Sequence, residues 1–352
     1  MPAQRTVRVT RLAPSPTGSL HLGNALAFLL GWSLARQRGW RIVLRIEDLD
    51  GPRIRPGTGT DAIEDLKWLG LDWDEGPLWQ SHDLIPYTEA LSALHAAKRI
   101  YPCRCTRREI ASAASAPHRE DHELRYPGTC RPREVWHDKA APLPQLSPSP
   151  TPADPVAWRM TVPDGPRSFQ DMIRGERTCD VARQVGDFVV MTKTLLPAYQ
   201  LAVVVDDIRH GVTDVVRGED LLDSTVRQEL LYQILAPTRV PRHWHTPLVV
   251  GPDGRRLAKR HGDTRLAFYR EHGTSPGRII ALLARWAGIQ DLPRKMEAAT
   301  FCRVFDLDRL PHGPLVFGPQ SHAWLLGSDH EPDPVTCEDT SPQCQPRKPP
   351  SP

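Results

Sequence analysis

The chain has 352 residues, of which 39% are hydrophobic and 25% are charged, as is usual for a globular protein of about two domains. Its 45 basic and 42 acidic residues leave a net charge of only +3, so the overall charge does not indicate a nucleic-acid-binding protein. No run of 18 apolar residues predicts a membrane span, and residues 1–11 lack the apolar segment of a signal peptide. We therefore expect a cytoplasmic protein that does not contact a membrane.

The first hundred residues predict a nucleotide-binding α/β fold. Strand, helix and strand in this order indicate a right-handed crossover unit of a parallel sheet. The predicted elements are a strand at 7–12, a loop at 13–18, a helix at 22–36 ended by Gly39, a buried strand at 41–46, and helices at 60–69 (ended by Gly70) and 85–97.

Residues 101–135 interrupt this pattern with cysteine, arginine and proline. Cys103, Cys105 and Cys130 are close enough in sequence to suggest a metal site. Residues 138–156 are rich in proline and predict a disordered insertion.

The remaining elements are predicted less evenly. Strands are expected at 187–191, 201–205 and 212–216, a helix at 224–235 capped by Asp223, a hairpin at 245–259 turning at 252–254, and a helix at 275–287. The strand at 201–205 would place Asp206 and Asp207 at its carboxyl end, where doubly wound sheets bind ligands. Residues 328–352 contain few apolar residues and predict a disordered tail.

A loop before the first helix contains His21, Gly23 and Asn24. The N-terminus of a helix suits phosphate, because it presents unpaired N–H groups and partial positive charge. Gly23 would let the backbone approach a nucleotide, and His21 could donate to a phosphate oxygen. A lone histidine at a helix start is more often structural, so this motif is weak by itself.

Several segments are rich in arginine and lysine. Each could bind phosphates, although a solvated surface is the commoner meaning of any single one: Arg104, Arg107 and Arg108; Arg125, Arg131 and Arg133; and Arg255, Arg256, Lys259 and Arg260. Lys259 on a mobile loop could neutralise a departing pyrophosphate.

Taken together and in this order, the motifs resemble the glutamyl branch of the class I aminoacyl-tRNA synthetases. The family's HIGH motif is similar to residues 21–24, and its KMSKS motif is similar to residues 256–260, with Ala258 where serine is common. Further segments that match the branch are residues 11–18, 44–50, 198–207 and 216–221. The resemblance implies a Rossmann-type parallel sheet of the class I synthetases, an inserted zinc-binding and acceptor-binding subdomain, and a small C-terminal helical region.

The resemblance also implies a domain plan. The catalytic domain would comprise residues 1–100 and 187–262, divided by the zinc-like segment 101–186. Residues 263–327 would form the helical region, and residues 328–352 the tail.

Within that branch the chain most resembles the short paralogues that act on queuosine in tRNA(Asp). It is short, its cysteine pattern is similar to theirs, and little chain follows residue 330 to form an anticodon-binding domain. Residues 305–311 point the other way, because they look like the junction to that domain in full glutamyl enzymes.

The resemblance implies roles for individual residues. His21 and Lys259 would be catalytic and, with Gly23 and Asn24, would bind ATP. The glutamate pocket would comprise Arg11, Ala13, Ser15, Glu47, Tyr199 and Arg217. Asp206 and Asp207 are expected to be structural or to support the pocket. The substrates would be L-glutamate, ATP with magnesium, and tRNA(Asp) carrying queuosine, and we expect a monomer.

Zinc would be a structural cofactor held by Cys103, Cys105 and Cys130. The resemblance gives Tyr126 as the fourth ligand, but tyrosine rarely binds zinc, and His118 and His122 in the same loop are chemically better donors.

Two rival functions remain. The chain could be a glutamyl-tRNA synthetase core that charges tRNA(Glu), or a non-catalytic relative that only binds RNA or nucleotide. By resemblance, the paralogue activates glutamate without tRNA, whereas full glutamyl enzymes require tRNA for that step.

Overall fold

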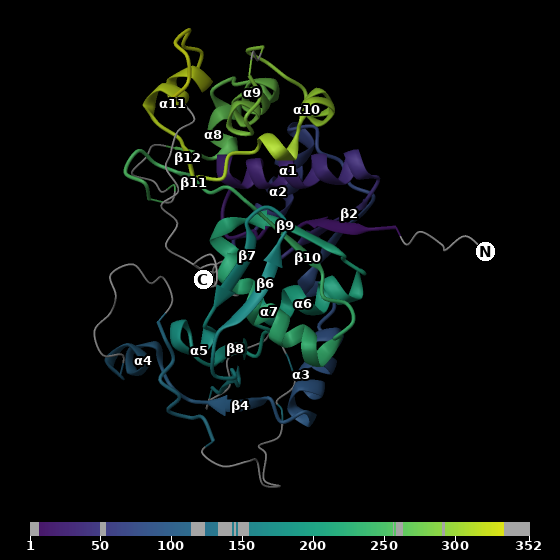
Figure 1. The fold of residues 1–352 in the computed structure, drawn as a ribbon, viewed down its shortest axis with the longest axis vertical. Coiled ribbons are helices and arrows are strands. Elements are labelled where there is room, and N and C mark those ends of the chain that lie inside the picture. The colour runs from purple at the N-terminus through teal and green to yellow at the C-terminus, as the bar shows by residue number, and fades with distance from the viewer. Residues whose placement is uncertain are drawn as a thin grey trace, which may run out of the picture.

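The computed structural model describes residues 7–49, 54–113, 124–132, 143, 146, 155–255, 257, 263–290 and 293–333. The molecule is elongated, with the C-terminal helices at one end, the segment around β4 and α4 at the other, and the parallel sheets between them (Figure 1). In the part of the chain that the structure describes, no helix is long and apolar enough to cross a membrane.

Residues 9–79 contain a parallel sheet, as predicted. Strands β1 (Val9–Leu12), β2 (Arg41–Ile46) and β3 (Glu75–Trp79) lie in that order. Helix α1 (Leu22–Arg38) connects β1 to β2, and α2 (Thr58–Trp68) connects β2 to β3. Gly39 ends α1 in the left-handed conformation, at φ 64°, which glycine adopts without a steric penalty.

Residues 167–246 contain a second sheet, with strands in the order β7-β6-β10-β9. Its strands are β6 (Arg167–Asp171), β7 (Gly175–Cys179), β9 (Asp214–Gly218) and β10 (Arg242–Thr246), and only β7 is antiparallel to its neighbour. Strand β9 lies beside β1, because the Thr213 N–H donates to the Val9 carbonyl at 2.9 Å. The carboxyl ends of β1, β2 and β9 can therefore contribute to one site, and the predicted α/β class is confirmed.

A third sheet lies at the far end of the molecule (Figure 1). It comprises β4 (Ile100–Cys103), β5 (Ala157–Met160) and β8 (Phe188–Met191), all antiparallel. Helices α3 (Ile85–Ala96), α4 (Arg107–Ala113) and α5 (Val181–Gln184) belong to the same part of the sequence. Strands β6 and β7 lie within the segment 101–186 assigned to the insertion, yet they join β10, so the domain plan remains a proposal.

The C-terminal region is helical and covers α1. It contains α8 (Leu266–Glu271), α9 (Pro276–Trp286), α10 (Ala298–Val304) and α11 (Pro319–Leu325). Residues from α9 and α10 share the main apolar core with α1, including Leu26, Leu283 and Phe301. Short strands β11 (Val249–Val250) and β12 (Leu315–Val316) pair in parallel beside these helices. Single-turn helices lie at Gln80–His82, Glu219–Leu221 and Leu307–Arg309.

The strand predicted at 201–205 is wrong. These residues lie in helix α6 (Tyr199–Arg209), which is buried at every position from Gln200 to Asp207. This helix is buried on all sides and contains five consecutive apolar residues, 201–205, a run that is equally typical of a buried strand. Asp206 and Asp207 therefore do not follow a strand; they lie on a helix beneath the sheet's carboxyl edge.

Three further expectations are corrected. Helix α7 (Leu222–Leu235) begins after Leu221, so Asp223 lies in its first turn and does not cap it. The chain turns at 252–254, but β10 and β11 join different parallel ladders and form no hairpin. The beginning of the predicted tail is ordered, because the Asp333 carboxylate accepts the Ser321 N–H at 2.7 Å. Residues 334–352 and most of 138–156 lie outside the described residues.

Gly59, in α2, makes room for the indole of Trp79. A Cβ at this position would lie 2.5 Å from two indole carbons.

We predict that Gly59→Ala lowers the free energy of unfolding by about 1–3 kcal/mol, although alanine is the better helix former. Denaturant titration measures this change. In a Trp79→Leu background the same substitution should become stabilising, and equal effects in both backgrounds would contradict the steric explanation.

Candidate active site

His21 is the N-cap of α1. Its Nδ1 accepts the backbone N–H groups of Gly23 at 3.1 Å and Asn24 at 3.3 Å, and the Asn24 side chain accepts the His21 N–H. Because Nδ1 is an acceptor, the neutral imidazole carries its proton on Nε2 and can donate from there. A Cβ at Gly23 would lie 3.1 Å from the imidazole, so the glycine also accommodates the His21 ring. The capping role and a donor role are thus compatible.

The basic loop that contains Lys259 begins and ends beside α1. After the loop, the Leu22 N–H donates to the Thr264 carbonyl at 3.0 Å, and the Leu266 N–H donates to the Leu20 carbonyl at 2.8 Å. Before the loop, Val249 lies 3.7 Å from the Cβ position of Gly23. Arg256, Ala258, Lys259 and Arg260 lie outside the described residues, so the role of Lys259 remains a prediction.

A buried network of ion pairs lies below the carboxyl ends of β1 and β2. Arg45 donates to Asp207 at 2.7 Å and to Glu47 at 3.1 Å, and it lies 3.8 Å from Asp206. Arg11 lies 3.6 Å from Asp207 and donates to the Val216 carbonyl at 3.1 Å. All five side chains are at most 7% exposed. The carboxylates of Asp206 and Asp207 are thus paired within this buried network.

Glu47 lies at the upper edge of this network. Its N–H donates to the Pro14 carbonyl at 3.0 Å, and Ser15 Oγ donates to Glu47 Oε2 at 3.3 Å. These bonds place the loop that contains Ala13 and Ser15 against the end of β2. Burial raises the pKa of Glu47, and Arg45 and Arg11 oppose that shift. The carboxylate is therefore destabilised by desolvation and would gain from a further cation.

Arg217 lies on β9 and is 5% exposed. Its Nε donates to His245 Nε2 at 3.0 Å, and its terminal nitrogens donate to Gln228 Oε1 at 2.7 Å and Thr225 Oγ1 at 2.9 Å. Burial, and next the positive charge of Arg217, lower the pKa of His245 despite its hydrogen bond to Asp171, so the imidazole is neutral. Arg217 is a buried cation whose three described acceptors carry no charge.

Tyr199 lies close both to Glu47 and to Arg217. Desolvation and then the negative charge of Glu47 raise the pKa of Tyr199 to about 12, while Arg217 and Arg11 oppose the shift. Tyr199 as a whole residue is 38% exposed, so it lies toward the solvent side of the site. The sequence-predicted residues Arg11, Ser15, Glu47, Tyr199 and Arg217 are therefore brought together.

Sequence reasoning missed several supporting residues. His245, Asp171 and Gln228 contact Arg217 directly or through one another, and each is at most 2% exposed. Their elements, β6, β10 and α7, contain several other polar residues, so no signal in the sequence singled these three out.

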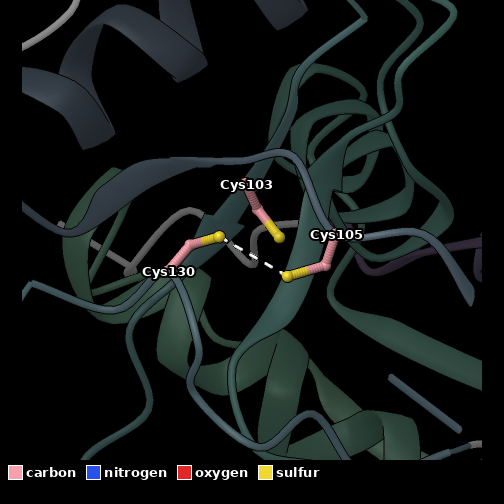
Figure 2. A group of neighbouring side chains, drawn as sticks. All are labelled: Cys103, Cys105 and Cys130. Atoms are coloured by element: carbon pink, nitrogen blue, oxygen red, sulfur yellow. Dashed lines mark hydrogen bonds between the residues drawn. The ribbon is translucent and has the colours of Figure 1, made fainter. Parts of the chain in front are cut away.

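Cys103, Cys105 and Cys130 converge at the far end of the molecule, and Figure 2 shows their sulfur atoms directed toward one another. The three Sγ atoms lie within 4.8 Å of one another, and those of Cys105 and Cys130 are 3.5 Å apart. The Tyr126 hydroxyl lies 3.5 Å from Cys103 Sγ and 3.9 Å from Cys105 Sγ. Tetrahedral zinc with Zn–S bonds of about 2.3 Å separates its sulfur ligands by roughly 3.8 Å, so this cluster fits the ion.

Arg159 is a further residue that the sequence did not reveal. Its Nε donates to Cys103 Sγ at 3.3 Å, and its guanidinium lies 3.8 Å from the centre of the Tyr126 ring. Arg159 therefore contacts both a cysteine of the cluster and the face of the tyrosine ring, and the latter contact is a cation–π interaction. His118 and His122 lie outside the described residues.

Comparisons with known proteins agree with this geometry. A family model described as "tRNA synthetases class I (E and Q), catalytic domain" matches residues 6–318. The chain therefore belongs to this class of synthetases.

Within the class, the chain belongs to the family of relatives named glutamyl-Q tRNA(Asp) synthetase. One from Rhodopirellula baltica is 47% identical over 292 residues, which cover 80% of this chain and 85% of the relative. Another, from Symbiobacterium thermophilum, is 45% identical over 326 residues, which cover 90% of this chain and 98% of the relative.

Solved structures support the fold. A glutamate tRNA ligase from Elizabethkingia meningosepticum, crystallised with its amino acid, superposes with a TM-score of 0.71 at 24% identity. The match covers 90% of this chain and 68% of that structure.

We predict that Arg45→Met lowers the free energy of unfolding by about 3–5 kcal/mol at neutral pH, because it removes the hydrogen-bonded cation from the buried carboxylates of Asp207 and Glu47. Arg41→Met on the same strand is the matched control, since Arg41 pairs with Glu75 at the surface and should change stability by less than about 1 kcal/mol. Denaturant titration compares the two. Equal effects would show that the buried network does not stabilise the fold.

Proposed function

We propose that this protein activates L-glutamate with ATP and transfers it to queuosine at the wobble position of tRNA(Asp). The observation that carries the first half is a group of buried side chains, with two complementary charge imbalances, at the carboxyl ends of β1, β2 and β9. The relatives named glutamyl-Q tRNA(Asp) synthetase, similar over most of both chains, support the second half.

The negative imbalance suits an amino group. Two guanidinium groups, of Arg11 and Arg45, face three carboxylates, of Glu47, Asp206 and Asp207. Among the described residues, this group therefore has one more carboxylate than guanidinium groups, and Glu47 is the carboxylate nearest the loop. The α-ammonium of glutamate would neutralise it through charge-assisted hydrogen bonds.

The positive imbalance suits the side-chain carboxylate of glutamate. Arg217 has five N–H bonds and uses three on neutral acceptors, so one remains on each terminal nitrogen. A carboxylate can accept from both. Glutamine would leave this buried cation without a counter-charge, at a cost of roughly 2–5 kcal/mol by analogy with truncated charge pairs. Tyr199 remains a neutral hydroxyl at physiological pH and can donate to the same substrate.

No side-chain nucleophile is required. The α-carboxylate of glutamate attacks the α-phosphorus of ATP, a P–O bond breaks, and pyrophosphate leaves. His21 Nε2–H and the first N–H groups of α1 would bind the phosphate oxygens as charge develops, and Lys259 would neutralise the pyrophosphate. Magnesium would accompany the ATP as a substrate complex. A queuosine hydroxyl then attacks the activated carbonyl carbon, loses its proton, and AMP leaves.

The decisive test is transfer of labelled glutamate to queuosine-containing tRNA(Asp). The same tRNA without queuosine and tRNA(Glu) serve as matched acceptors. We expect label only on the first, and glutamate-dependent ATP–pyrophosphate exchange in the absence of tRNA. Label on tRNA(Glu) would instead identify a glutamyl-tRNA synthetase core, and neither label nor exchange, with tRNA present or absent, would leave a binding protein.

We also propose that Cys103, Cys105, Cys130 and Tyr126 hold one structural zinc ion. The spacing of the sulfurs and the hydroxyl supports this set, and Arg159 would offset part of its negative charge. When bound, the ion would cross-link β4 to the segment that contains Tyr126. A cytoplasmic, monomeric enzyme would fit these substrates.

The fourth ligand can be tested by measuring zinc content and zinc release to a chelator. We predict that Cys130→Ser loses the metal and that Tyr126→Phe releases it faster, because the phenol oxygen is a ligand. Tyr101→Phe is the matched control, since that hydroxyl donates to Asp187 at 2.5 Å and not to a sulfur. Unchanged release from Tyr126→Phe, with faster release from His118→Ala or His122→Ala, would reassign the ligand.

A further inference from the structure

We propose that Asp171 and His245 are positioning residues for glutamate recognition: together they fix the orientation of the Arg217 guanidinium and the direction in which its free N–H bonds point. The proposal rests on the proposed function, because the carboxylate that Arg217 would bind belongs to glutamate. It concerns a buried relay from β6 through β10 to β9, which lies behind the pocket.

The first link joins Arg217 to His245. Arg217 Nε donates to His245 Nε2 at 3.0 Å, and Thr225 Oγ1 accepts from a terminal nitrogen while lying 3.5 Å from the same His245 Nε2. His245 and Thr225 therefore occupy the edge of the guanidinium that contains Nε. This arrangement requires Nε2 to be an acceptor, so the imidazole must be neutral with its proton on Nδ1.

The second link sets that tautomer. Asp171 Oδ2 lies 2.6 Å from His245 Nδ1 and accepts its proton. Asp171 Oδ1 accepts three backbone N–H groups, from Ile173 at 2.9 Å, Arg174 at 2.8 Å and His245 at 3.3 Å. These donors fix the carboxylate, so that only Oδ2 faces the imidazole. Both Asp171 and His245 side chains are fully buried.

A third link fixes the other edge of the guanidinium. Gln228 Oε1 accepts from Arg217 at 2.7 Å, and the Gln228 amide donates to Gln200 Oε1 at 3.0 Å. The Gln200 amide in turn donates to Ser224 Oγ at 3.0 Å. The guanidinium plane is thus held at both edges by neutral groups, which positions the arginine without neutralising it.

This geometry makes an isosteric substitution informative. In Asp171→Asn the three backbone N–H groups still require an oxygen at the Oδ1 position, so the amide NH₂ must face His245 Nδ1. The histidine would then accept at Nδ1 and move its proton to Nε2. Two N–H donors, on His245 and Arg217, would meet at a separation that now holds a hydrogen bond, and the guanidinium would turn away.

The test uses the full chain and three proteins: wild type, Asp171→Asn and Asp214→Asn. Asp214 is the control because it is an equally buried aspartate on β9 whose partners include Arg8 and Trp244, outside the relay. Glutamate-dependent pyrophosphate exchange gives KM for glutamate and for ATP. Long-range ¹H–¹⁵N NMR of ligand-free protein gives the His245 tautomer, with the signals assigned by their loss in His245→Gln.

We expect Asp171→Asn to raise KM for glutamate by about 10- to 100-fold, by analogy with the loss of a hydrogen-bond partner that orients a metal-binding histidine, with KM for ATP unchanged. The His245 proton should move from Nδ1 in the wild type to Nε2 in this variant. Asp214→Asn should match the wild type in both readouts.

An unchanged KM for glutamate, an equal rise in KM for ATP, or a wild-type proton on Nε2 would overturn the relay. If the wild type shows no glutamate-dependent exchange, with or without tRNA, the proposed function fails instead. The tautomers of wild type and Asp171→Asn still decide the relay in that case, because they are measured without substrate.

Discussion

The site depends on one buried arginine, Arg45, which links strand β2 to helix α6. Arg45 reaches from β2 to Asp206 and Asp207 on α6 and to Glu47 at the end of its own strand. Asp206 also accepts from the Tyr87 hydroxyl at 3.0 Å and from Gln80 at 2.7 Å. Buried charges are tolerated only when they are paired and hydrogen-bonded, so these contacts restrict α6 to one position relative to β2. That restriction places Tyr199, at the start of α6, beside Glu47.

A second constraint concerns Arg217, a buried cation, in contrast to the paired charges around Arg45. Among the described residues, the acceptors that Arg217 donates to are neutral, namely His245, Gln228 and Thr225, and burial lowers the pKa of the arginine. A buried cation hydrogen-bonded to neutral groups suits an anionic ligand. Under the proposed function, that ligand is the side-chain carboxylate of glutamate, and the carboxylates around Arg45 would meet its amino group. The capped N-terminus of α1, which suits phosphate, lies on the neighbouring connection from β1.

The cysteine cluster lies in a separate part of the molecule, where a different set of contacts stabilises the chain. Small irregular segments bury little apolar surface, and the proposed metal cross-link would compensate for that deficit. Tyr101 and Val162 both donate to the Asp187 carboxylate, and Arg159 donates to the Asp187 carbonyl, so β4, β5 and the start of β8 are tied together next to the sulfur atoms. The segment can thus hold its shape independently of the pocket.

The sequence by itself determined the α/β class, the family, the glycine that ends α1 and the residue types of the pocket, because these follow from local periodicity and from motifs in a set order. It misread residues 201–205, because five consecutive apolar residues are equally typical of a buried strand. It also could not reveal Asp171, His245 or Arg159, which act on residues far away in the chain. Only the tertiary structure decided which charges are paired and which remain unbalanced, because a charge's partner depends on distance in space and not on separation in sequence.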